Sequence, residues 1–466
     1  MSTADLSVIF GYLALTLVAG IWAGLKQTGA SFWVNGRSSR PMMLGFSIIS
    51  TQVGAGVIIG IASATYSSGI GLTVVSIISI TVGMLGIGLL APILKQFGDK
   101  YQAVTLSEFF LVRYDRSTQI ACSYVILFVY LSFLAAQFVA VAALLNIWSG
   151  IGFHSALVFG CIGVVIYTAF AGLRGDILTD FIHFWVMAIV FLLVLVPILL
   201  RQVPDVLLSF PPDFWSPTYF AGWTFLLFGV LLGGVLPVVG MEIWQRIYAS
   251  VTPNAARKVF WCAPLIVVPF YIFSTYLGMC ALATEPGLRN PDLAPFLVIN
   301  NFLPQGVMGL AVAALLATLL STANSMALVV SATLYRDILR REQDNSSVYA
   351  SRAWTLAAGI CGLFAALIIP NIVQLMLNAF YVLGTLFFSF IGGLFWHKST
   401  ARGATLSIAL GGLTTIISLP LIPKVAFLPG LFVSLPVFVV ASLLTSHSST
   451  EKVQLCENLL GRNGIS

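Results

Sequence analysis

The chain is divided into long apolar blocks that alternate with short polar breaks. Most blocks have about 20 residues, the length that a helix needs to cross the hydrocarbon core of a bilayer. Hydrophobic residues make up 59% of the chain and charged residues only 8%, whereas soluble domains have about 25% charged residues. So few charges cannot cover a water-facing surface. The pattern excludes a soluble globular protein and predicts an all-α, polytopic membrane protein.

The apolar blocks predict thirteen membrane spans. They run from Leu6 to Leu25, Met42 to Tyr66, Gly71 to Ile93, Ile120 to Ile147, Ser155 to Ala171, Ile177 to Leu200, Ala221 to Gln245, Val259 to Ala283, Gly306 to Tyr335, Trp354 to Ile369, Asn371 to Trp396, Ala404 to Leu421 and Val425 to Thr445.

The distribution of Lys and Arg supports this map and orients it. Alternate loops and tails contain 19 of the 22 basic residues, and the other set contains only Arg201, Arg289 and Lys424. Because cytoplasmic loops are enriched in Lys and Arg, we expect the N-terminus outside and the C-terminus in the cytoplasm. The compact length and short loops are typical of a bacterial inner-membrane protein.

Composition and motifs exclude several functions. The net charge of +6 is explained by basic cytoplasmic loops, so no nucleic-acid partner is expected. The polar tail 446–466 is too short for a catalytic or output domain, which disfavours an enzyme and a transport-derived sensor. The sequence contains no H-E-x-x-H and no G-x-S-x-G motif, and its four His are scattered. We therefore expect no enzymatic activity.

Two predicted spans are rich in glycine, at Gly45–Gly60 and at Gly229–Gly240, and the second also contains Pro237. Each is interpreted either as a broken helix, whose free backbone groups hold an ion and a substrate, or as a helix that packs closely through small residues. The two spans are five spans apart, and an odd number of spans inverts the second half. This spacing favours a transporter built from inverted repeats, with a midplane site between the two broken helices.

The ninth span contains a polar face formed by Thr318, Ser321, Thr322 and Ser325, spaced at i, i+3, i+4 and i+7. Hydroxyl and carbonyl oxygens suit weak coordination of a hard cation such as Na⁺. The alternative is that these hydroxyls only bond their own helix carbonyls.

Charged groups near the inner ends of spans have two interpretations each. Asp180 is either a cation ligand or the partner of Arg174, and His183 is either a proton relay or an interface residue. Glu242 and Arg246 form either an intracellular gate or a solvated helix end.

A capping box is predicted on the cytoplasmic side. Thr105 and Glu108 have the spacing in which each side chain bonds the other residue's backbone N–H. We expect a short helix there that leads to the fourth span.

Four segments together resemble the sodium/solute symporter family. The most specific are Ser-Thr-Ala-Asn-Ser at 321–325 and Gly-Leu-Arg followed by Thr-Asp-Phe-Ile within 172–182. The segments occur in the family's order, at Ser47–Gly71, Tyr167–His183, Trp244–Ser250 and Leu320–Asp337.

The resemblance implies a LeuT-type fold with five-plus-five inverted repeats, one extra N-terminal helix and two extra C-terminal helices. It also implies a Na⁺ site between the first broken helix and the Ser-Thr helix. Its ligands would be the carbonyls of Ser50, Val53 and Thr318, where the family commonly has Ala at 318, and the hydroxyls of Ser321 and Thr322. Some members hold a second Na⁺ at positions that match Asp180 and Ser325.

Substrate groups in such a fold come from the broken helices and their neighbours. The polar candidates at mid-membrane depth are Gln52, Gln137, Asn378 and Tyr381. Proline-type members place an acid where this chain has Gln52, which disfavours proline. The predicted binding region contains no Lys or Arg, so a substrate carboxylate would need helix N-termini or amides, and a neutral or zwitterionic solute is favoured.

The function expected from the sequence is Na⁺-coupled uptake of a small organic solute by alternating access, with proton coupling through Asp180 and His183 as the alternative. The expected organisation is an N-terminal helix and loop at 1–41, repeats at 42–201 and 221–397 around an extracellular loop at 202–220, two helices at 398–445 and a tail at 446–466.

Overall fold

The structure is a computed structural model that describes residues 2–25, 27–28, 31–208, 210–304, 306–340, 348–369, 371–445 and 450–460. Part of the predicted tail, at 446–449 and 461–466, lies outside the described residues. The described residues form helices and no β-strand, with one isolated bridge between Ser39 and Ser250.

The longer helices, in chain order, are α1 (Thr3–Gly24), α2 (Pro41–Gln52), α3 (Ala62–Ser68), α4 (Gly71–Tyr101), α5 (Ser107–Arg113), α6 (Arg116–Ser149), α7 (Phe153–Met187), α8 (Val196–Gln202), α9 (Gly222–Val239), α10 (Met241–Ala249), α11 (Pro253–Thr284), α12 (Ala294–Phe302), α13 (Val307–Ala332), α14 (Val348–Ile368), α15 (Ile372–Leu383), α16 (Leu386–Phe395), α17 (Ala401–Ser418), α18 (Phe427–Leu444) and α19 (Thr450–Leu459). Short helical turns are η2 (Asn35–Arg37), η3 (Gly56–Ile61), η4 (Ala188–Leu195), η5 (Val206–Leu208), η6 (Pro212–Trp215), η7 (Pro291–Leu293) and η8 (Thr333–Ile338).

The helices confirm the prediction of an all-α membrane protein. In the described part of the chain, ten helices are long and apolar enough to cross a bilayer, and an eleventh span forms if α2 and the bent segment 56–68 count as one. One 50-residue stretch, Phe153–Gln202, is interrupted at Gly172, whose φ of 53° and ψ of −172° are not helical. The predicted number of thirteen spans stays a prediction.

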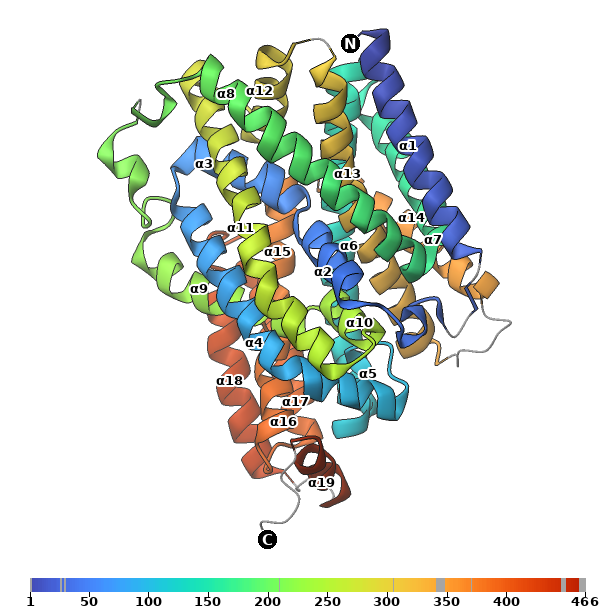
Figure 1. The fold of residues 1–466 in the computed structure, drawn as a ribbon. Coiled ribbons are helices and arrows are strands. Elements are labelled where there is room, and N and C mark those ends of the chain that lie inside the picture. The colour runs from blue at the N-terminus through green and yellow to red at the C-terminus, as the bar shows by residue number, and fades with distance from the viewer. Residues whose placement is uncertain are drawn as a thin grey trace.

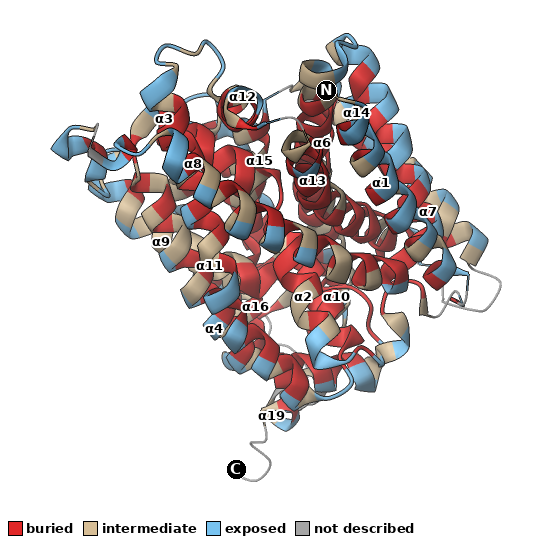
Figure 2. Cartoon of the chain, turned by 45° about the horizontal axis from the view of Figure 1, so that its top comes forward, coloured by how far each residue is buried: buried red, intermediate tan, exposed pale blue. Residues whose placement is uncertain are grey.

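The helices are arranged as a buried centre with an apolar rim. The most apolar windows of α6 and α13 are each 83% buried, whereas those of α1 and α18 are only 28% buried (Figures 1 and 2). The exposed side chains of the rim include large apolar residues such as Phe10 at 66% and Leu265 at 80%. An exposed surface of this composition fits contact with lipid rather than water. The burial of α6 and α13 places any functional group on them inside the bundle.

The two reciprocal hydrogen bonds of the predicted capping box are present just before the short helix α5, whose N-cap residue is Leu106. The Thr105 N–H donates to Glu108 Oε2 at 3.1 Å, and the Glu108 N–H donates to Thr105 Oγ1 at 3.3 Å. This pair satisfies backbone donors that the first helical turn leaves free.

The N-terminal helix is fixed to the start of α13 by one carboxylate. Asp5, which is 1% exposed, accepts the N–H groups of Gly306 at 3.0 Å and Gly309 at 2.8 Å. A Cβ at Gly309 would lie 2.6 Å from the Asp5 backbone, so only glycine allows this approach. The negative charge at a helix N-terminus also interacts favourably with the helix dipole. The contact sets where α1 lies relative to α13.

We expect Asp5→Ala to lower the free energy of unfolding by about 1–2 kcal/mol, because it leaves N–H groups of α13 without an acceptor. The measurement is the thermal unfolding midpoint of the purified protein in detergent. Asp213→Asn, at an exposed position in η6, is the control and should leave the midpoint unchanged. Equal midpoints for the two variants would contradict this role of Asp5.

Candidate substrate and ion site

The first predicted helix break is present and lies between α2 and η3. The two segments Pro41–Gln52 and Gly56–Ser68 are bent by 45°. At the break, the Ala55 N–H donates to the Gln137 side-chain oxygen of α6 at 3.0 Å. A Cβ at Gly54 would lie 2.4 Å from Thr322 Oγ1, so glycine lets the break approach α13 closely. The break is therefore held by α6 on one side and by α13 on the other.

Several oxygens are gathered at this break. The Thr322 hydroxyl donates to the carbonyls of Thr51 at 2.9 Å and Thr318 at 3.1 Å. Among the described residues, no N–H or hydroxyl donates to the carbonyls of Ser50 and Val53. The Ser50 hydroxyl is also buried without a partner in this part of the chain. These groups form an oxygen-rich region in an apolar interior, which is the chemistry that a hard cation requires.

The predicted set of sodium ligands is thus only partly brought together. The carbonyl of Thr318 and the hydroxyl of Thr322 meet at the break, but the Ser321 hydroxyl donates to Asp180 instead. The Thr318 hydroxyl donates to the Leu315 carbonyl of its own helix at 2.7 Å, as the alternative interpretation of this polar face expects. Ser321 connects the break to a second polar cluster.

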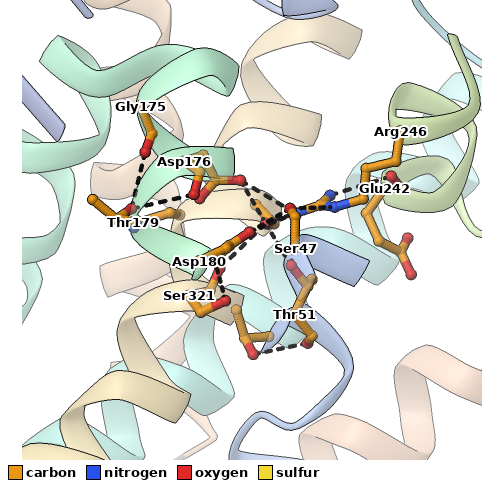
Figure 3. Close-up of polar contacts among 12 residues, drawn as sticks. Ser47, Thr51, Gly175, Asp176, Thr179, Asp180, Glu242, Arg246 and Ser321 are labelled. Atoms are coloured by element: carbon orange, nitrogen blue, oxygen red, sulfur yellow. Dashed lines mark hydrogen bonds and ion pairs between the residues drawn. The ribbon is translucent and has the colours of Figure 1, made fainter. Parts of the chain in front are cut away.

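That second cluster is a buried charge network centred on Arg246 of α10. Its Nη2 lies 3.2 Å from Asp176 Oδ2 and 3.3 Å from Asp180 Oδ2, both on α7 (Figure 3). All three side chains are at most 1% exposed. With both carboxyl groups ionised, the network would contain two negative charges and one positive charge. Since buried charge is costly unless it is paired, one additional cation or one proton would balance the network.

Hydroxyl groups from α2 and α13 complete the network. Arg246 Nη2 donates to Thr51 Oγ1 at 2.6 Å and to Ser325 Oγ at 2.7 Å. Ser47 donates to Asp180 Oδ2 at 2.5 Å, and Ser325 donates to Asp176 Oδ2 at 2.9 Å. The network therefore joins α2, α7, α10 and α13 at one point.

The ion pair of Asp180 is formed with Arg246 and not with Arg174, the partner that the sequence suggested. Arg174 is exposed, and the ion-pair partner of Asp180 is Arg246. Asp180 and Arg246 are 66 residues apart in the sequence, so no local spacing pattern predicts that they pair. His183, one turn beyond Asp180, is buried, and its Nδ1 lies 2.6 Å from the Tyr12 hydroxyl of α1. It is a core residue rather than an interface residue.

The second predicted break is present, at the last glycine of the segment Gly229–Gly240. α9 continues through Gly229 and Gly233 to Val239, and the chain is extended at Gly240, with ψ of 114°, before α10 begins. Gly233 instead packs against α4, where an added Cβ would lie 2.4 Å from Ser79. Close packing is therefore the role of these glycines, and Gly240 marks the break.

Both breaks border one cavity of about 200 Å³. Gly54 and Gly56 from the first break and Pro237 and Glu242 from the second line its wall. Most of the other lining residues are apolar, among them Val75, Leu232, Phe225, Met376 and Phe427. A mostly apolar cavity with a few polar groups is typical of a small-molecule site.

Three of the four predicted substrate residues line this cavity. Gln52 and Gln137 contribute amide groups, and Tyr381 lines it while donating its hydroxyl to the Lys424 carbonyl at 2.8 Å. Asn378, on the same helix as Tyr381, is not among the lining residues. Its side chain is half-buried, and its role in substrate binding stays a prediction.

The two predicted gate residues of α10 point in different directions. The Arg246 guanidinium contacts the aspartates. Its contact with Glu242 is to the backbone carbonyl, at 3.3 Å, and not to the carboxylate. The Glu242 carboxylate points away from the network, as Figure 3 shows, and lines the cavity. Both residues are buried, which excludes a solvated helix end.

The sequence interpretation missed Asp176, Ser47 and Thr51. The signal for Asp176 was its i, i+4 spacing with Asp180, which places both carboxylates on one helical face. Ser47 and Thr51 have the same spacing on α2. The pairing of these two faces depends on the fold and has no local signal.

An all-helical membrane bundle with two helix breaks on one buried cavity, and a polar network beside it, defines a membrane transporter. The sequence model of the sodium:solute symporter family matches residues 32–206 and 215–411. The chain therefore belongs to the sodium:solute symporter family, as the four sequence segments indicated.

Curated relatives are similar over nearly the whole chain, and a solved structure has the same fold. The chain is 27% identical to the sodium/pantothenate symporter of Escherichia coli, covering 93% of this chain and 95% of that one. It is 25% identical to the sodium/proline symporter of Staphylococcus aureus, covering 93% and 90%. The structure of a substrate-bound, outward-open Na⁺-coupled sialic acid symporter superimposes with a TM-score of 0.82 at 18% identity, covering 96% and 99%. This likeness confirms the predicted LeuT-type fold.

We expect Arg246→Ala to lower the free energy of unfolding by about 3–5 kcal/mol, because it leaves two buried carboxylates without a positive charge. The measurement is the thermal unfolding midpoint in detergent. Arg174→Ala removes the same charge from an exposed position and should change the free energy by less than about 0.5 kcal/mol. A larger loss for Arg174→Ala would contradict the assignment of Arg246 as the partner of the aspartates.

Proposed function

We propose that this chain takes up a small organic solute together with Na⁺ by alternating access. The observation that carries the proposal is the oxygen-rich helix break, which lies on the cavity and beside a network of two carboxyl groups and one guanidinium. A cation at this place would interact with both the cavity wall and the network. Solute and ion then stabilise the same arrangement of helices, which is the physical basis of coupling.

The first proposed Na⁺ site lies between the break and α13. The carbonyls of Ser50, Val53 and Thr318 and the hydroxyls of Ser321 and Thr322 are its proposed ligands. Support comes from the free carbonyls at the break and from the contact of Thr322 with Thr51 and Thr318. Ser321 would turn its oxygen lone pairs to the ion while it donates to Asp180.

The second proposed Na⁺ site contains Asp180 and Ser325. Arg246 already donates to both residues, so an ion there either shares the aspartates with the guanidinium or takes its place. The charge count supports this proposal, since two carboxylates accommodate one guanidinium and one monovalent cation. Entry of Na⁺ would therefore weaken the contacts of Arg246 with α7 and α13. Because Arg246 lies on α10, binding of the ion would then favour movement of α10.

The driving force is sufficient for uptake. A membrane potential of about 100 mV supplies about 2.3 kcal/mol per charge, and a tenfold Na⁺ gradient adds about 1.4 kcal/mol. One ion therefore supports accumulation of the solute by several hundredfold, and a second ion would square that factor.

The proposed arrangement in the membrane follows the basic residues. The N-terminus is outside and the C-terminus is in the cytoplasm, and the membrane is a bacterial inner membrane. The proposed repeats are 42–201 and 221–397. Support for the repeats comes from the two breaks, one near the start of each repeat, that border the same cavity.

Proton coupling is a second candidate, because a proton would also balance the network. The buried contact of His183 with Tyr12, one turn from Asp180, favours this candidate. In that case Ser321 and Thr322 only pack against their neighbours, and uptake follows the proton gradient without Na⁺.

We expect Ser321→Ala and Thr322→Ala to raise the Na⁺ concentration for half-maximal uptake at least tenfold, because each removes a proposed ligand. The assay is uptake of pooled labelled solutes (amino acids, sugars, nucleobases and carboxylates) into liposomes under an inward Na⁺ gradient. Thr415→Ala, which removes a buried hydroxyl bonded only within α17, is the control and should behave like the wild type. Uptake that needs only a proton gradient, and that neither variant changes, would establish proton coupling instead.

A further inference from the structure

The cavity wall has an unusual charge composition for a membrane site. Among the described residues that line the cavity, Glu242 is the one acid, and there is no Lys, Arg or His. The remaining polar groups are amides and hydroxyls, and the rest of the wall is apolar. An ionised carboxylate at membrane depth is costly without a partner, and it is usually functional. The groups that contact the Glu242 carboxylate therefore bear on which solutes this cavity binds.

The partners that the structure gives to Glu242 are neutral. The carboxylate accepts a hydrogen bond from the Tyr130 hydroxyl and a long one, 3.4 Å, from the Gln52 amide. None of the described ion pairs includes Glu242, and the guanidinium of Arg246 lies in the separate network with Asp176 and Asp180. Glu242 is also the second residue of α10. Its carboxylate therefore has neutral hydrogen-bond donors and no cationic partner among the described residues.

A second polar group in the wall is unpartnered. Gln137 is fully buried and lines the cavity. Its oxygen accepts the Ala55 N–H, and its Nε2 has no hydrogen-bond partner in the described part of the chain. An unpaired buried amide N–H is unfavourable, so Nε2 is available to donate to an acceptor on a bound molecule. Glu242 and Gln137 thus offer an acidic acceptor and a neutral donor to the same cavity.

These two groups select a chemical class of solute. A hydroxyl would bond Glu242 but would leave its negative charge in place, whereas an ammonium group neutralises the charge and donates hydrogen bonds. A solute whose only charge is a carboxylate meets one negative group and no basic one. The apolar lining, including Val75, Phe225 and Leu232, suits a hydrocarbon body.

We propose that the transported solute carries a protonated amine that binds the Glu242 carboxylate, an acceptor oxygen that binds Gln137 Nε2, and an apolar body that fills the rest of the cavity. Zwitterionic amino acids and amino alcohols with apolar side chains belong to this class. The inference rests on the proposed transport function and names the class of its solute.

The test compares amines with their deaminated analogues. The probes are leucine with 4-methylpentanoate, leucinol with 4-methylpentan-1-ol, and valine with 3-methylbutanoate, each supplied to wild-type proteoliposomes with an inward Na⁺ gradient or with K⁺ in place of Na⁺. We expect Na⁺-dependent uptake of at least one amine, and uptake of its deaminated analogue at least tenfold lower. Na⁺-dependent uptake of a deaminated analogue as fast as that of its amine would overturn the inference while leaving the transport function intact.

The role of Glu242 is tested with Glu242→Gln, which keeps the size of the side chain and removes its charge. We expect the apparent affinity for the amine to fall at least tenfold, while Na⁺ in the absence of solute still raises the thermal unfolding midpoint as in the wild type. Glu285→Gln, the same change at a half-buried position that does not line the cavity, is the control. An unchanged affinity for the amine in Glu242→Gln would overturn the assignment. Amine uptake that is identical in Na⁺ and K⁺, but still sensitive to Glu242→Gln, would reject Na⁺ coupling and keep the inference.

Discussion

The contact of Arg246 with Asp176 and Asp180 is the interaction on which the centre of this molecule depends. It brings α10 against α7, and the hydroxyls of Thr51 and Ser325 extend it to α2 and α13. Desolvation makes a buried ion pair a weak source of net stability, but the loss of one partner is costly. The network therefore fixes which helices meet rather than how tightly the whole protein is folded.

The proposed ion site and the cavity share the same structural elements. The break after Gln52 contributes carbonyls on one side and the cavity wall on the other, and Thr322 contacts both. On α10, the Arg246 side chain points toward the network, as Figure 3 shows, and the Glu242 side chain lines the cavity. A change in either region therefore acts on the other through two short segments. Coupling of ion and solute requires such a shared element with more than one arrangement.

Much of this organisation could be predicted from the sequence, because it follows from local constraints. Apolar length, the positions of Lys and Arg, and the glycines at 54 and 56 predict spans and the first break without knowledge of any contact. Within the second glycine-rich segment the sequence could not tell which glycine interrupts the helix, since glycines that allow close packing, such as Gly233, have the same signature as Gly240. The partner of Asp180 was beyond prediction because it is set by tertiary packing across many helices.

The most direct test of the central claim is equilibrium binding of radioactive sodium to the purified protein in the absence of solute, counted per molecule. The account predicts saturable binding in the wild type and one fewer ion in Asp180→Asn, because that substitution removes the charge that the second ion balances. A wild-type protein that binds no sodium, and that takes up a proton when solute binds, would contradict it.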